Sequence, residues 1–292
     1  MSLGQEFTDA LVRIARSAEM DDIRAAAGLV APLHGKPPYD GVEITRDLKY
    51  GDHERHRLDV FRANDRAGEP RPVLVFVHGG GFVGGDKSSP GSPFYDNIGV
   101  WAARNGMVGV NIVYRLAPQH QWPAGGEDVS AAVDWVKAHI AEHGGDPTRI
   151  IVAGTSAGAM HVSTYLAGPY GVVGKIKGAI LLSCLFDMPT CEKNPLLFAY
   201  YGEDAAKYAE QSTLKAMAET PIPVLVTVAE FDPLDFERQT LAYINAFFDK
   251  RGHWPNVLRL TGHNHFTTAW HIGTADDHLA VQMLEFVRRS CG

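Results

Sequence analysis

The sequence predicts an α/β protein whose mainly parallel sheet is covered by helices on both faces. Six apolar runs are bounded by turn residues, and they are continuous rather than alternating, which is typical of strands buried on both faces. Helical patterns lie between these runs, and such alternation of strand and helix indicates a parallel sheet. The runs are VLVFV (73–77), MVGVNIVY (107–114), RIIVAG (149–154), GAILLS (178–183), PVLVTVA (223–229) and NVLRL (256–260).

The helical patterns and two more polar stretches complete the expected fold. The segment 124–145 carries Ala132, Val136 and Ile140 at helical spacing and ends at a Gly-Gly pair, which is a helix stop signal. The stretches 41–51 and 55–63 are more polar, which predicts an antiparallel edge of the sheet. Helices are also expected at 157–167, 233–250 and 275–290.

The domain organisation follows from the even distribution of these patterns. No internal repeat or low-complexity linker divides the 292 residues, so we expect one domain over 1–292. The segment 185–220 is less regular and interrupts the sheet pattern. Together with residues 1–40 it is expected to form a small cap or lid over the sheet, and ordinary surface packing of both segments is the alternative.

Composition and charge exclude several classes of protein. The net charge is -7 and no basic stripe is present, which argues against a nucleic-acid partner. No apolar stretch reaches the roughly 18 residues that cross a bilayer, so no membrane span is expected. The amino-terminal stretch lacks the basic start and apolar core of a secretion signal. The 3 cysteines are too few for a disulfide framework, which favours a cytoplasmic location.

A nucleophile is predicted in the stretch RIIVAGTSAGAMHV (149–162), which contains G-x-S-x-G centred on Ser156. The motif follows a strand pattern and precedes a helical one. A serine on such a sharp turn stands exposed above the strand ends, and the flanking glycines leave room for neighbouring backbone. A glycine-lined turn with a capping serine is the alternative.

A serine nucleophile needs a histidine base, and the base needs an orienting carboxylate. The expected chain order on such a sheet is serine, acid, histidine, and this chain meets it. We favour Asp232 as the acid because it directly follows the strand at 223–229 and Pro233 restricts its direction. His263 and His265 both follow the last strand, and the order alone does not separate them. The carboxylates weighed for the acid are Glu230, Asp232, Asp235 and Glu237.

The glycine-rich stretch HGGGFVGGDKSS (78–89) satisfies G-x-G-x-x-G literally, but a dinucleotide loop must lead directly into a helix. Pro90 and Pro93 oppose a helix there, and Asp86 replaces the glycine that a phosphate loop needs before its lysine. Acyl transfer instead needs backbone amides aimed at the negative oxygen of a tetrahedral intermediate. The amides predicted to form this oxyanion hole are those of Gly80, Gly81 and Ala157.

Two further site predictions concern metals and pocket walls. The H-x-H pattern at 263–265 could ligate zinc, but no further ligands are assembled around it, so no metal is expected. Five side chains in loops beside the motifs are candidates for the substrate pocket, with ordinary packing as the alternative for each. They are Phe82, Phe94, Tyr95, His120 and Trp122.

Together these motifs resemble the hormone-sensitive-lipase-like carboxylesterases of the α/β-hydrolase superfamily, over roughly residues 55 to 290. Gly154-Thr155-Ser156-Ala157-Gly158 is similar to the nucleophile motif of the GTSAG branch, and the Gly-x-x-His spacing of the base motif favours His265. The other matching motifs are HGGGF (78–82), YRLAP (114–118) and DPL (232–234). Departures from the family pattern, such as Phe266 after the histidine, touch the pocket walls.

The resemblance implies an α/β-hydrolase fold with an eight-stranded sheet, a cap from the amino terminus and no cofactor. It implies a serine carboxylesterase that hydrolyses short-to-medium acyl esters through an acyl-enzyme intermediate. A kynurenine-formamidase-like amide hydrolase and a non-catalytic ligand receptor of the same fold are the alternatives. An edge strand at 256–260 also makes a homodimer possible.

Overall fold

Eight strands in the described part of the chain form a single sheet. The computed structural model describes residues 5–14, 16–17, 19–65, 68–275 and 277–292. The strand order is β1-β2-β4-β3-β5-β6-β7-β8. The two pairs that involve β2 are antiparallel and the other pairs are parallel, which confirms the predicted α/β sheet with an antiparallel edge. The strands are β1 Val42–Lys49, β2 Arg57–Ala63, β3 Arg71–Val77, β4 Val108–Ile112, β5 Gly145–Thr155, β6 Gly178–Leu182, β7 Val224–Phe231 and β8 Asn256–Asn264.

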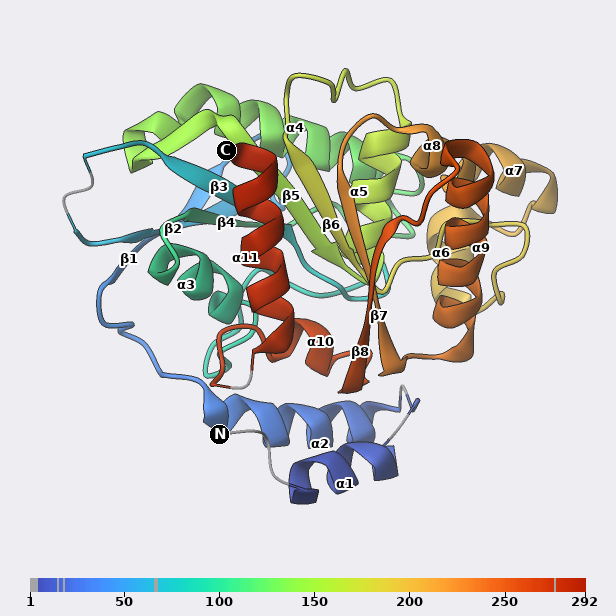
Figure 1. Cartoon of the computed structure of the whole chain (residues 1–292), viewed down its shortest axis with the longest axis horizontal. Helices are drawn as coiled ribbons and strands as arrows, with labels where there is room; N and C mark the ends of the chain where they lie inside the picture. The colour runs from blue at the N-terminus through green and yellow to red at the C-terminus, as the bar shows by residue number, and fades with distance from the viewer. Residues whose placement is uncertain (1–4, 15, 18, 66–67, 276) are drawn as a thin grey trace.

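Helices cover both faces of this sheet, as Figure 1 shows. Helices α3 (Asp96–Arg104) and α11 (His278–Cys291) pack on one face. On the other face lie α4 Ala124–His139, α5 Ala157–Ala167, α8 Leu214–Glu219 and α9 Leu234–Arg251. Helix α3 was not predicted from the sequence. It is buried on nearly every side, so it lacks the polar stripe by which a surface helix is recognised.

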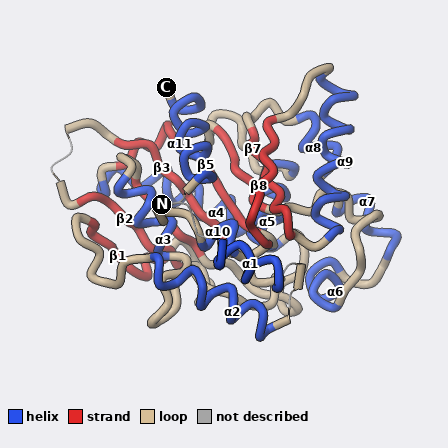
Figure 2. The backbone as a smooth tube through the Cα atoms, turned by 60° about the horizontal axis from the view of Figure 1, so that its bottom comes forward, coloured by secondary structure: helices blue, strands red, loops and turns tan. Residues whose placement is uncertain are grey.

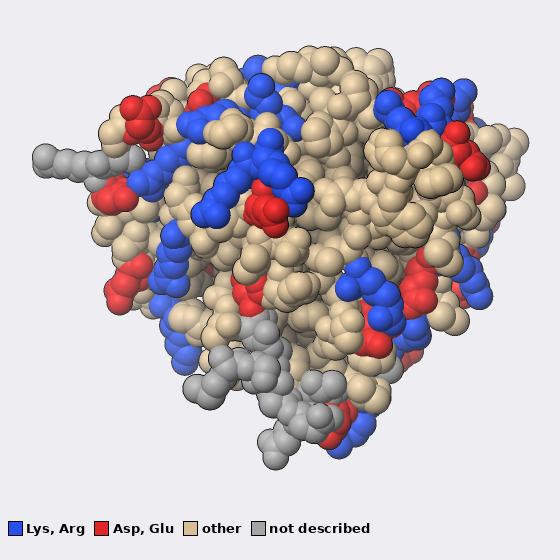
Figure 3. Space-filling view, viewed as in Figure 1, with Lys and Arg blue, Asp and Glu red and all other residues tan. Residues whose placement is uncertain are grey.

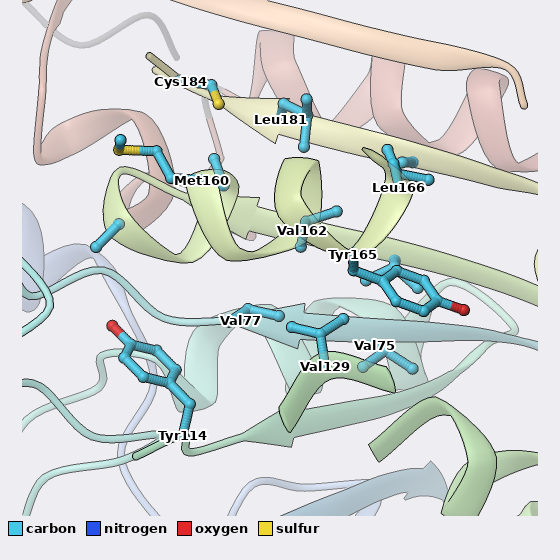
Figure 4. Packing of buried hydrophobic residues seen from close by; sticks show 14 of the residues in the cluster. Val75, Val77, Tyr114, Val129, Met160, Val162, Tyr165, Leu166, Leu181 and Cys184 are labelled. Atoms are coloured by element: carbon cyan, nitrogen blue, oxygen red, sulfur yellow. The ribbon is translucent and has the colours of Figure 1, made fainter. Parts of the chain in front are cut away.

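Two hydrophobic cores follow from the alternation of side chains along the strands. In β3, Val73, Val75 and Val77 face the core beneath α4 and α5, whereas Leu74 and Phe76 face the core beneath α3 and α11. Figure 4 shows the first core, where side chains of α5 meet those of the neighbouring strands. Burial on both faces explains why the central strands read as continuous apolar runs.

The amino-terminal helices α1 (Gln5–Ile14) and α2 (Met20–Val30) lie across the carboxyl ends of the strands (Figures 1 and 2). Their apolar side chains pack with Phe94 and Trp270, the latter on the short helix α10 (Thr267–Trp270). The segment predicted to be irregular carries α6 (Pro195–Tyr201) and α7 (Tyr208–Gln211) before α8. Residues 1–4, 15 and 18 of the predicted cap, and residue 276 of the predicted last helix, lie outside the described residues.

The surface and the sheet edge bear on the expected partners. Figure 3 shows positive and negative side chains interspersed on one face of the molecule. Among the residues that the structure describes, no helix has the length and apolar character to span a membrane. Strand β8 lies at the edge of the sheet. The homodimer through this edge and the cytoplasmic location stay predictions.

Candidate active site

Ser156 stands on a sharp turn between β5 and α5. Its backbone has φ 54° and ψ −124°, a strained conformation for a non-glycine residue. The turn leaves no room for a side chain at Gly158, where an added Cβ would lie 2.2 Å from the carbonyl oxygen of Val77. The amide of Ser156 donates a hydrogen bond of 2.9 Å to the carbonyl of Leu182 on the neighbouring strand. The hydroxyl is therefore held above the carboxyl end of the sheet.

The structure brings Ser156, His265 and Asp232 together in one hydrogen-bonded chain. Nε2 of His265 lies 2.8 Å from Oγ of Ser156, and Nδ1 lies 2.6 Å from Oδ1 of Asp232. Asp232 is fully buried, and the side chain of His265 is 12% exposed. With the proton on Nδ1, the imidazole donates to the carboxylate and leaves Nε2 free to accept from the serine hydroxyl, the tautomer that a general base needs.

The carboxylate of Asp232 is held by groups on three parts of the chain. Its Oδ2 accepts hydrogen bonds of 2.7 Å from the hydroxyl of Ser183 and of 2.7 Å from the amide of Ala229. Its Oδ1 is left for His265. Nothing in the sequence singles out Ser183, because it belongs to none of the motifs. The carboxylate therefore has a fixed orientation before any substrate binds.

The other acid candidates are engaged elsewhere. Glu230 and Asp235 each accept a hydrogen bond from a backbone amide, at 2.9 and 3.0 Å. Burial raises the pKa of Asp235. Glu237 forms an ion pair of 2.6 Å with Arg16, whose guanidinium also donates to the backbone carbonyl of Asp232. The amino-terminal segment thus contacts the loop that carries Asp232.

His263, the other histidine of the H-x-H pattern, has different neighbours from His265. Nδ1 of His263 is 3.3 Å from Oγ1 of Thr267, and its ring packs against that of His271. Within the described ranges, no group of three or more His, Cys, Asp or Glu side chains could hold a metal ion.

The glycine-rich loop after β3 runs directly beside Ser156. An added Cβ on Gly79 would lie 3.4 Å from Cβ of Ser156. Gly80 has φ 135°, and an added Cβ there would lie 2.2 Å from the carbonyl oxygen of Gly84, so only glycine fits this turn. The amide of Ala157 is the first of α5, where backbone N–H groups lack intrahelical partners and the helix dipole favours negative charge.

The buried side chain of His78 contacts the backbone of this loop. It is fully buried, its Nδ1 lies 2.5 Å from the carbonyl oxygen of Gly79, and its ring stacks on Tyr114 at 4.4 Å. Burial lowers the pKa of His78 to about 3, so the ring is neutral at physiological pH. A neutral ring that donates to a loop carbonyl acts as a brace.

The five side chains proposed for the pocket lie in different surroundings. Phe82 and Phe94 are buried. Phe82 stacks on Tyr200 at 4.6 Å, and Phe94 stacks on Trp270 at 4.7 Å. The ring of His120 packs edge-on against another histidine at 4.9 Å. The half-buried members of the set are Tyr95, His120 and Trp122. Their role as pocket walls stays a prediction.

Three apolar side chains outside the predicted set of pocket walls lie against the site. The rings of Phe236 and Phe266 flank His265, with centroids 4.6 and 5.3 Å from the imidazole. Leu196 of α6 reaches over the glycine loop, since its Cδ1 lies 2.7 Å from the position of an added Cβ on Gly81. Phe236 and Phe266 lie close in sequence to the acid and base motifs, and this proximity is the sequence feature that could have identified them. Leu196 is distant in sequence from every motif, so no sequence feature indicated it.

Comparison with known proteins gives a family match for residues 74–265, to the family described as "alpha/beta hydrolase fold". Esterase LipC of Mycobacterium tuberculosis is 42% identical over 123 residues, which cover 42% of this chain and 29% of that protein. Tuliposide A-converting enzyme b1 of Tulipa gesneriana is 38% identical over 140 residues, which cover 44% of this chain and 36% of that enzyme. The matched region thus spans about a third of the length of these relatives.

Solved structures resemble this chain over nearly its whole length. Esterase B from Lactobacillus rhamnosis has a TM-score of 0.75 at 15% identity, with 99% of this chain and 97% of that chain covered. An esterase from Pyrobaculum calidifontis has a TM-score of 0.70 at 24% identity, with 99% of each chain covered. These similarities show a common fold.

Proposed function

Because the chain belongs to the α/β-hydrolase-fold family, we propose that it is a serine carboxylesterase acting through an acyl-enzyme intermediate. The observation that carries this proposal is the hydrogen-bonded chain from Ser156 through His265 to Asp232. Several relatives of similar sequence bear the name of esterase or carboxylic ester hydrolase, which supports the same reaction class.

In the proposed mechanism, His265 accepts the proton of Ser156 as Oγ attacks the ester carbonyl. Asp232 holds the imidazole in the correct tautomer and stabilises the imidazolium. The alcohol leaves with the proton from His265, and water then attacks the acyl-enzyme by the same route. No further group is needed to complete the proton balance.

The oxyanion of each tetrahedral intermediate is assigned to the amides of Gly80, Gly81 and Ala157. The loop position beside Ser156 and the start of α5 support this assignment. Amides that are fixed before the reaction stabilise developing charge without reorganisation, and in many such enzymes this stabilisation contributes most to the rate enhancement.

Short-to-medium acyl esters are the substrate class that the surroundings favour. Phe236 and Phe266 flank the base, and Leu196 covers the glycine loop, so the groups nearest the reacting atoms are apolar. The amino-terminal helices, which contact Phe94 and Phe266, are proposed to act as the cap over this site.

The test combines a substrate panel with labelling of the nucleophile. We expect hydrolysis of p-nitrophenyl esters from acetate to medium-chain acyl groups, and covalent labelling of Ser156 by a fluorophosphonate. Ser156→Ala should lower turnover by on the order of 10⁶, as judged from a serine protease, and should abolish labelling. A folded protein that resists the label would instead support a ligand receptor, and faster turnover of N-formylkynurenine than of any ester would support an amide hydrolase.

A further inference from the structure

The strand next to the nucleophile ends in a second strained serine. Ser183 directly follows β6, is fully buried and has φ 52°, and Ser156 directly follows β5 with φ 54°. Thr155 and Leu182, the residues before the two serines, are register partners in the parallel pair β5–β6. The two serines therefore occupy equivalent positions directly after the carboxyl ends of adjacent strands.

The hydroxyl of Ser183 has a specific partner there. Its Oγ lies 2.7 Å from Oδ2 of Asp232, and an ionised carboxylate only accepts hydrogen bonds, so the serine donates. Glycine would adopt a positive φ at no steric cost, whereas serine at this position is strained. A strained residue whose hydroxyl reaches the buried carboxylate indicates that the hydroxyl itself is needed.

We propose that Ser183 is a positioning residue that fixes the carboxylate of Asp232 for its work on His265. This inference rests on the proposed function of the triad. Ser183 and the amide of Ala229 both donate to Oδ2, so Oδ1 alone faces the imidazole. Loss of the hydroxyl removes one of two restraints on rotation of the carboxylate. It also leaves more negative charge on Oδ1, which stabilises the imidazolium more strongly.

Other charged and titratable residues lie near this pair, and the Ser183 variants do not replace them. Arg16 of the amino-terminal segment donates to the backbone carbonyl of Asp232, and its second contact is Glu237 on α9. His263 on β8 faces Thr267. If substitution of Ser183 changes the pH profile or the Nδ1 proton resonance of His265, the change is therefore transmitted through the carboxylate of Asp232, which lies between the two residues.

The experiment compares Ser183→Ala and Ser183→Gly with wild type. The alanine variant loses only the hydroxyl, whereas the glycine variant also loses Cβ and relieves the strain at φ 52°, so an effect common to both variants separates positioning from folding. We expect both variants to lower kcat on p-nitrophenyl acetate by about 10-fold to 100-fold, the range for a hydrogen bond to a charged group, with KM within about twofold. We also expect the acid limb of the kcat/KM profile to move to higher pH.

The matched control is Thr227→Val. Thr227 accepts the amide of Ser183 through its backbone, and its buried side-chain hydroxyl has no hydrogen-bond partner among the described residues. This variant should behave as wild type in kcat and pH profile. Wild-type kcat and an unmoved pH profile in both Ser183 variants would overturn the proposal.

A readout without turnover separates this proposal from the esterase assignment. The Nδ1 proton of His265, followed by NMR, reports its hydrogen bond to Asp232 whether or not the protein hydrolyses esters. We expect this resonance to shift in both Ser183 variants and to stay in place in Thr227→Val. Inactivity of wild type on every ester would refute the proposed function alone, and an unchanged resonance in the Ser183 variants would refute the positioning role.

Discussion

The rings of Phe82 and Tyr200 lie parallel, with centroids 4.6 Å apart and an interplanar angle of 3°. Phe82 directly follows the glycines of the proposed oxyanion hole, and Tyr200 belongs to α6. The hydroxyl of Tyr200 accepts a hydrogen bond of 3.0 Å from the amide of Gly125 at the start of α4. One stacked pair thus connects the glycine loop to two helices on the same side of the sheet.

Replacement of Tyr200 should therefore affect both stability and catalysis. Tyr200→Ala leaves a large cavity next to Phe82, and we expect the free energy of unfolding to fall by about 3–5 kcal/mol, with a loss of kcat because the loop is no longer held. Tyr200→Phe keeps the stack and loses one hydrogen bond, worth about 1 kcal/mol. Urea unfolding measures the stability of each variant, and ester kinetics measures its kcat. Equal stability of the two variants would contradict a supporting role for the ring.

The glycine loop offers a matched pair of substitutions. Gly80→Ala places a Cβ 2.2 Å from a backbone oxygen at φ 135°, whereas Gly84→Ala places one 3.8 Å from the nearest atom, an ordinary contact. We expect Gly80→Ala to lower kcat by at least about 10²-fold, the cost of a lost oxyanion donor. Gly84→Ala should stay close to wild type. The two kcat values are measured by steady-state kinetics on p-nitrophenyl butyrate. A similar loss of kcat in both variants would argue against a specific role for Gly80.

The fold and the strand-end positions of the proposed triad were predictable from the sequence for physical reasons. Central strands are buried on both faces, so they appear as continuous apolar runs, and the positions of Ser156 and Asp232 follow from turns at strand ends. The choice of His265 over His263 depended on a family resemblance. In the structure, His263 contacts Thr267 and His271, and it is His265 whose Nε2 lies 2.8 Å from Oγ of Ser156.

Contacts between segments far apart in the chain were not predictable in this way. Ser183 is 49 residues from Asp232 in sequence, and Arg16 is 216 residues from it. Neither lies in a recognisable motif, and their proximity depends on strand order and on the path of the amino-terminal segment. Leu196 reaches the glycine loop for the same reason. Local patterns carry no information on such pairs.

The contact of Arg16 with the acid loop gives a prediction about the amino-terminal helices. Arg16 and Glu237 are each about one-third exposed, so their ion pair should contribute at most about 1 kcal/mol to overall stability. We expect Arg16→Ala to leave the melting temperature almost unchanged and to speed hydrogen exchange in α1 and α2. Arg24→Ala, which removes an exposed ion pair with Asp21, is the control. Equal exchange in both variants would show that Arg16 does not hold these helices.

A last prediction concerns His161, which lies on α5, the helix that follows Ser156. Its ring is fully buried among Phe82, Tyr114 and Tyr200, and neither ring nitrogen has a hydrogen-bond partner among the described residues. Burial lowers the pKa of His161 to about 3, and the neighbouring His78 acts in the same direction. The native protein therefore keeps this ring neutral over a range in which the unfolded chain binds a proton.

The sign of the effect on stability follows from that difference. Between the unfolded value of about 6.5 and about 3, the unfolded state holds one more proton at this residue, so the free energy of unfolding falls as the pH falls. His161 contributes a slope of up to about 1.4 kcal/mol per pH unit in this window. His161→Phe removes the titrating group without breaking a hydrogen bond, and it should make the urea-unfolding free energy less dependent on pH between about 6.5 and about 3. His278→Gln, at an exposed position, should keep the wild-type slope, and a wild-type slope in His161→Phe would mean that the ring is already protonated in the native state.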